Sequence, residues 1–125
     1  MRKVIILISV LNVIFVFMHE FDACYCGEWK MFRFIRKCKE KTQYLIFLYI
    51  HLPLTLFLFY YLWTVVNFNN IILWVIINAF LIFHFVLHLI ARRWKSNVFL
   101  SYHSFIFIAG AALTGIINLC LIAFY

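Results

Sequence analysis

Five histidines carry most of the chemistry that this chain could perform. His84 and His88 are four residues apart, so on a helix they share one face and can both reach a single ion. Imidazole together with carboxylate oxygen suits zinc, iron or manganese. Asp22 lies three residues after His19, and Glu28 follows closely. The pattern predicts a His/carboxylate site for a divalent transition metal, namely zinc, iron or manganese.

Each residue of this predicted site receives a role. The expected metal ligands are His19, His51, His84, His88 and Asp22. Glu28 or Asp22 is expected to act as a catalytic base, and His103 is expected to orient a ligand through its second nitrogen. In the competing interpretation, the histidines hydrogen-bond between membrane helices and serve packing alone.

Four apolar stretches must position these residues, at about residues 4–23, 43–66, 71–90 and 99–125. Each has about the 20 residues that cross a hydrocarbon core, and none shows the alternation of a barrel strand. With 68% hydrophobic and 12% charged residues, the chain leaves no room for a soluble domain. We therefore expect an all-α membrane protein whose residues 1–125 form one domain. The first stretch also resembles a signal peptide, but no small-x-small cleavage site precedes Cys24, so we expect a retained helix.

The positions of the histidines along these stretches place all five near the same membrane face. Ionisable groups are costly inside a bilayer, so they normally face the bundle interior and mark a function. Pro53 should kink the second helix beside His51, because proline cannot donate to the carbonyl of Tyr49.

The basic residues predict the orientation. Nine of the 11 lysines and arginines lie in the loops after the first and third stretches, and the other two are Arg2 and Lys3. Since cytoplasmic loops are rich in Lys and Arg, we expect a multi-pass protein of the cell (inner) membrane with both termini outside. Cys24, Cys26 and Cys38 would then lie in a reducing compartment, where unpaired thiols are expected.

The loop at residues 27–41 mixes aromatic side chains with six basic ones. This mixture is typical of an interfacial segment that lies on anionic headgroups, so the lipid bilayer with its anionic inner leaflet is the predicted partner. Topology and lipid account for the net charge of +7, and no nucleic-acid partner is predicted.

The opposite half of the bundle has structural rather than chemical features. Asn12, Asn78 and Asn118 fall at similar depth, where their amides can bond between helices. The small residues at 109–115 should allow close packing, and an oligomer through this Ala109–Gly115 face is also predicted.

The polar spacing resembles that of a group of small bacterial membrane proteins of unknown function. The resemblance rests on His19-x-x-Asp22, Glu28-Trp29, His51-x-Pro53 and His84-x-x-x-His88, and it spans most of the chain. The chain is also similar to the HXXEE-type membrane domain, although Ala23 stands where that motif has its second acid. The resemblance implies a site at His19, Asp22, Glu28, Trp29, His51, His84 and His88, with no established reaction.

Two classes of function fit these features. In the first, a metal site performs hydrolytic or redox chemistry on a lipid or another membrane-embedded substrate. In the second, the protein is a metal or proton transporter or an accessory subunit, and its histidines bind an ion or pack helices. Motifs of named hydrolases such as Gly-x-Ser-x-Gly and His-Glu-x-x-His do not occur in the chain.

Overall fold

The computed structural model describes residues 1–94 and 101–124, and within these ranges it contains helices and no strands. The long helices are α1 (Arg2–Cys26), α2 (Glu40–Asn67), α3 (Ile71–Ala91) and α4 (Tyr102–Ala123). Each of the four is long and apolar enough to cross a membrane. The predicted all-α class with four spanning helices is therefore confirmed, and no helix end differs by more than three residues from the prediction.

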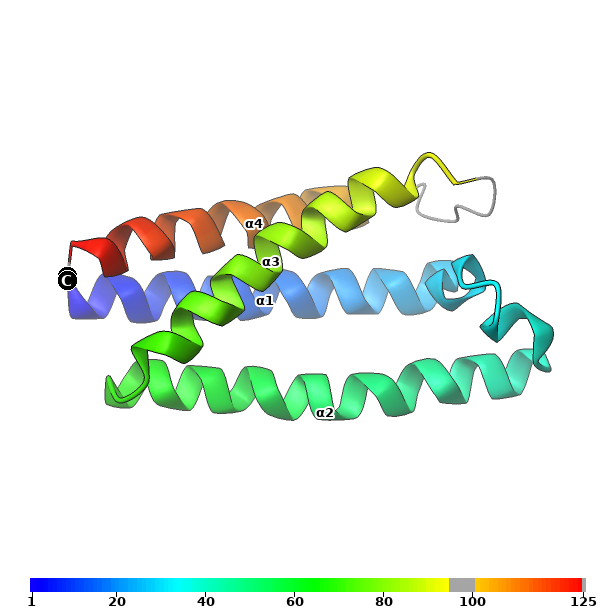
Figure 1. Cartoon of the computed structure of the whole chain (residues 1–125), viewed down its shortest axis with the longest axis horizontal. Helices are drawn as coiled ribbons and strands as arrows, with labels where there is room; N and C mark the ends of the chain where they lie inside the picture. Colours follow the sequence, from blue (N-terminus) through cyan, green and yellow to red (C-terminus); the bar gives the residue numbers. More distant parts are fainter. Residues whose placement is uncertain (95–100, 125) are drawn as a thin grey trace.

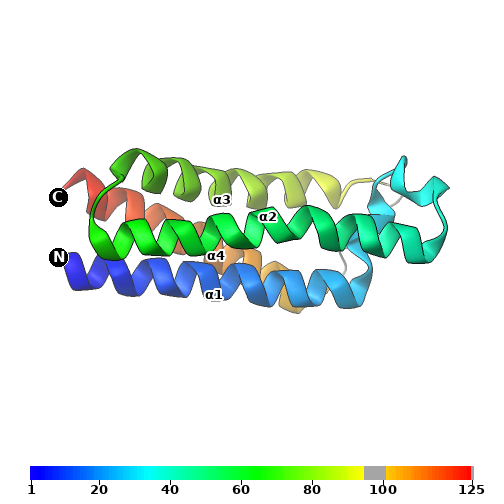
Figure 2. The same cartoon turned by 90° about the horizontal axis from the view of Figure 1, so that it is seen from below.

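The helices form an elongated antiparallel bundle. Both termini lie at one end of it, together with the α2–α3 turn, as Figure 2 shows. The opposite end, which we call the histidine end, carries two short 3-10 helices between α1 and α2, η1 (Glu28–Met31) and η2 (Ile35–Lys37). α1 and α3 pack mainly against α4, whereas α2 makes fewer contacts with its neighbours. In Figure 1, α3 crosses the bundle obliquely.

Local signals fix the helix ends. Gly27 takes a left-handed conformation (φ 67°) after α1, and its N–H bonds to carbonyls of the last turn of that helix. The Asn70 side chain accepts a hydrogen bond from the N–H of Leu73 at 3.0 Å, and Ser101 caps α4 in the same way through the N–H of Ser104 at 3.3 Å. These caps set the positions at which α3 and α4 begin.

A polar layer crosses the bundle in the half opposite the histidine end. The Asn12 amide donates to Oδ1 of Asn78 at 2.8 Å, and the Asn118 amide donates to the same oxygen at 3.3 Å. Tyr61 of α2 joins the layer by donating to Ser9 Oγ at 2.9 Å. Asn12, Asn78, Asn118 and Tyr61 are each 0% exposed. The predicted bonding between the three asparagines is confirmed, and with Tyr61 the layer links all four helices.

The small residues of α4 lie against its neighbours. Ala111, Ala112 and Gly115 are buried, and a Cβ added at Gly115 would lie 3.1 Å from the backbone oxygen of Asn78 in α3. A Cβ at Gly110 would meet the ring of Phe15 in α1 at 3.0 Å. The predicted close packing at these glycines is confirmed. Because this packing occurs inside the chain, much of the Ala109–Gly115 face is already covered without a second copy.

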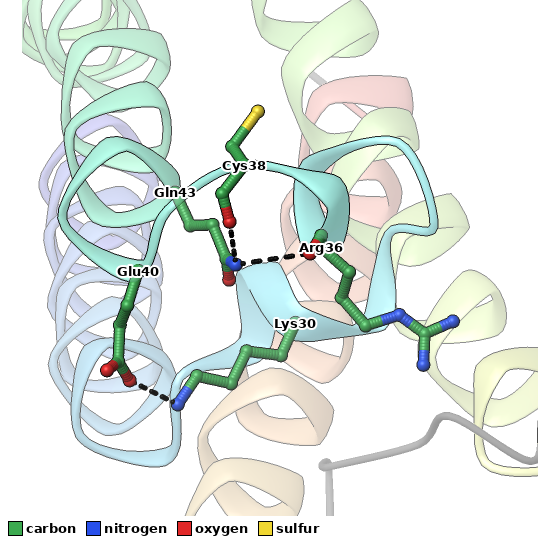
Figure 3. A network of polar contacts seen from close by, with 5 residues as sticks. All are labelled: Lys30, Arg36, Cys38, Glu40 and Gln43. Carbon is green, nitrogen blue, oxygen red and sulfur yellow. Dashed lines mark hydrogen bonds and ion pairs between the residues drawn. The ribbon is translucent and has the colours of Figure 1, made fainter.

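The η1–η2 loop is fastened to the start of α2 (Figure 3). The Gln43 amide nitrogen donates to the carbonyl of Cys38 at 2.7 Å and to that of Arg36 at 3.4 Å. Lys30 forms an ion pair with Glu40 at 2.8 Å. Trp29 and Ile35 of the loop pack in a small core with Ala23 and Phe47. These contacts hold the loop as an ordered cap over the histidine end.

Candidate metal centre

Three imidazoles meet inside the histidine end. One ring nitrogen each of His19, His84 and His88 lies within 4.8 Å of the others. The centroid of the His88 ring lies 4.8 Å from that of His19 and 4.7 Å from that of His84. His84 and His88 reach the cluster from successive turns of α3, while His19 comes from α1. Among the described residues, this is the group that could hold a metal ion.

Ser104 and Glu28 orient His19. Nδ1 of His19 lies 2.9 Å from Ser104 Oγ, and Ser104 Oγ donates to Oε1 of Glu28 at 3.4 Å. With its proton given to Glu28, the hydroxyl accepts from Nδ1–H of His19. In this tautomer Nε2 of His19 is the nitrogen that can ligate a metal, as in sites where a partner behind the ligand fixes its ring.

His51 and Glu20 form a second polar pair. Nδ1 of His51 lies 2.6 Å from the carbonyl of Phe47, and its Nε2 lies 3.0 Å from Oε2 of Glu20. A carbonyl only accepts, so Nδ1 must carry a proton. A close contact between Nε2 and a carboxylate oxygen then requires one further proton between them. The pair can therefore take up and release a proton.

A cavity of about 330 Å³ joins the two groups. Its wall contains the three clustered histidines together with His51, Glu20 and Glu28. The rest of the wall is formed mostly by apolar side chains, among them Met31, Phe34, Phe47 and Ile50. The polar groups thus face one space whose remaining surface suits an apolar molecule.

Glu28 is the acidic residue of the loop that faces this cavity, and its side chain is buried. Burial, with the nearby carboxylates of Glu20 and Asp22, raises the pKa of Glu28 to about 8, although the Ser104 hydroxyl and His51 act in the opposite direction. A group with this pKa exchanges protons near neutral pH.

The structure brings together only part of the predicted ligand set. His51 lies outside the three-histidine cluster and pairs with Glu20 instead. Asp22 accepts a hydrogen bond from Cys26 Sγ at 3.7 Å and does not line the cavity. His103 is exposed on α4, and its neighbour Ser104 contacts His19. Pro53, at which the sequence predicts a kink, lies inside the uninterrupted helix α2, two residues after His51.

Sequence reasoning missed Glu20 and Ser104 as site residues. Glu20 follows His19 directly, so its spacing gives no sign that it meets a residue of α2. A serine in an apolar helix is common, and only its contact with His19 reveals its position in the site.

One family model matches nearly the whole chain. Its description is "Family of unknown function (DUF6713)", and the match covers residues 5–125. The chain belongs to the DUF6713 family. No curated protein and no solved structure matches it. The match to DUF6713 includes every histidine of the site, and it agrees with the predicted membership of an uncharacterised family.

Proposed function

We propose that this DUF6713 protein is a membrane-embedded, metal-dependent enzyme that hydrolyses a lipid-like substrate. His19, His84 and His88 hold one divalent transition metal, zinc being the simplest choice. The observation that carries the proposal is the convergence of three imidazoles beside a cavity that also contains the Glu20–His51 pair. Catalytic zinc sites typically combine three protein ligands with an open position for water or substrate.

The cluster needs little change to bind an ion. Tetrahedral zinc with Zn–N bonds of about 2.0–2.1 Å separates its nitrogens by roughly 3.3 Å. The ligand nitrogens here lie within 4.8 Å of one another, so small side-chain rotations would bring them to the spacing of a zinc site. Three neutral imidazoles leave the charge of the ion uncompensated, which favours deprotonation of a bound water.

The Glu20–His51 pair supplies the proton transfer. A metal ion held by the three histidines would activate a water for attack on an ester carbonyl carbon, and the deprotonated pair would accept the proton that this water loses. The carbon–oxygen bond to the leaving alcohol then breaks, and the pair returns its proton to that alcohol. One water is consumed, and an acid and an alcohol are formed.

Metal binding is the first test. Chain purified in mild detergent and loaded with Co²⁺ should hold one ion, and added azide should change its visible spectrum if a coordination position is open. His84→Gln and His88→Gln should abolish binding. His103→Gln is the matched control, because His103 is an exposed histidine at the same end of the bundle. A Co²⁺ content that is zero, or that falls equally in the control, would contradict the site.

The catalytic role is tested separately. Glu20→Gln should keep the Co²⁺ stoichiometry but move the pH at which the azide-sensitive spectrum titrates, because the proton acceptor beside the ion is lost. A transporter, the alternative, would instead show Co²⁺ flux into proteoliposomes that His84→Gln abolishes. Such flux would replace the enzymatic proposal.

A further inference from the structure

A second cavity lies between α2 and α3, further from the histidine end. Its volume is about 200 Å³, and no polar surface lines it. Its wall is formed by Leu54, Phe57, Leu58, Ile76, Ile77 and Phe80. An apolar surface of this kind offers no partner to polar groups and suits hydrocarbon.

The two cavities follow one another along the same pair of helices. In α2, Ile50 and His51 line the first cavity, and Leu54 lines the second about one turn later. In α3, His84 lines the first and Phe80 the second, and their rings stack with centroids 5.7 Å apart. Because α2 and α3 run antiparallel, both helices place the apolar cavity on the same side of the histidines.

We propose that the two cavities form one groove for a single fatty acyl chain whose carbonyl lies at the histidine cluster. The natural substrate is then a fatty acyl ester. This inference rests on the proposed function, since it names the substrate class of the same site.

The dimensions favour an acyl chain over a protein segment. An α-helix with its side chains is about 10–12 Å across, which is too wide for a cavity of about 200 Å³. Between His84 and Ile77, α3 rises by roughly 10 Å at ~1.5 Å per residue. A flexible hydrocarbon chain can follow this length while its head stays among the polar side chains.

Charge favours a lipid with its head at the histidine end. Arg33, Arg36, Lys37, Arg92 and Arg93 are exposed around that end. Basic side chains in this position attract anionic headgroups or a free carboxylate. The groove is polar and basic at one end and apolar at the other, which suits the polar head and apolar tail of an acyl lipid.

Photolabelling tests the groove in the full chain. The probe is palmitic acid with a mid-chain diazirine, added to the Co²⁺-loaded protein in detergent. We expect labels on the groove residues of α2 and α3 several-fold above those on Leu56, which is 63% exposed and points away from both cavities. Leu54→Trp should fill the groove and lower this labelling several-fold. Leu56→Trp is the matched control and should leave it unchanged.

The outcomes separate this inference from the proposed function. Labels spread evenly over exposed helix surfaces in a chain that holds Co²⁺ would overturn the groove and leave the metal site standing. Labels concentrated in the groove of a chain that binds no Co²⁺ would support the acyl site and overturn the metal centre. Cross-linking of groove residues to a second protein chain, without probe, would overturn the acyl occupant. Equal helix content by circular dichroism and equal melting temperatures in both tryptophan variants show that they fold.

Discussion

At the scale of single residues, Glu28 places a buried carboxyl group of the η1–η2 loop next to the histidines. Its carboxyl is buried beside Glu20 and Asp22, so the neutral form is favoured in the folded chain. Its hydrogen bond from Ser104 reaches on to His19. Glu28 therefore connects the loop to the imidazole cluster through one hydroxyl group.

This position predicts a pH dependence of stability. The pKa of Glu28 is about 8 in the folded chain against 4.5 for an ordinary glutamate. Between these values the folded state keeps a proton that the unfolded state releases. The contribution of Glu28 to stability is therefore full below pH 4.5 and is lost as pH rises towards 8, by at most about 1.4 kcal/mol per pH unit. In metal-free protein, the melting temperature should fall more between pH 6 and pH 9 in wild type than in Glu28→Gln. Parallel curves for the two proteins would show that Glu28 is not held neutral.

The sequence predicts the depth of a side chain better than its direction. His19, His84 and His88 share a depth, and the spacing of the two α3 histidines alone indicates a common face. His51 has a suitable depth as well, yet it meets Glu20. Neighbouring residues on a helix point about 100° apart, so the choice between His103 and Ser104 depends on how α4 is rotated. Only the packing of the four helices settles that rotation.

At the scale of elements, the strongest sequence signals are the long apolar stretches. They predict all four helices because backbone groups in a membrane must bond within their own segment. The loop at residues 27–39 was harder to predict. Its two 3-10 turns depend on tertiary contacts of Gln43, Trp29 and Ile35 rather than on a repeating pattern.

The contact of α4 with α3 predicts a difference between two glycines. A Cβ at Gly115 would press on the backbone oxygen of Asn78, which cannot move alone, whereas a Cβ at Gly110 would press on the ring of Phe15, which can rotate. We expect Gly115→Ala to lower the free energy of unfolding by about 1–3 kcal/mol. Gly110→Ala should cost less, because its contact is with a side chain and not with backbone. The helix propensity of alanine, worth up to about 1 kcal/mol, acts equally at both positions. Unfolding in mixed detergent micelles measures both, and equal losses would contradict the assignment of the tight contact to Gly115.

At the scale of the whole molecule, the bundle combines a hydrogen-bonded polar layer with open space along α2. The asparagine layer ties all four helices together, while α2 packs more loosely and borders both cavities. Space along a helix that makes few contacts with its neighbours supports the proposal of a lipid-like ligand. The basic residues gather at the histidine end, so the orientation of the bundle decides which leaflet would supply the proposed ligand.

We predict that the histidine end faces the cytoplasm and that both termini lie outside. Two single-cysteine proteins in a cysteine-free background test this: one keeps Cys38 in the loop of the histidine end, and the other carries Asn69→Cys in the α2–α3 turn, where Asn69 is exposed. In intact cells an impermeant maleimide should label the Asn69→Cys protein and leave Cys38 unlabelled until the membrane is opened. The expected direction follows from the excess of Lys and Arg at the histidine end, since such residues are retained on the cytoplasmic side. Labelling of Cys38 alone in intact cells would reverse the orientation and place the proposed acyl site in the outer leaflet.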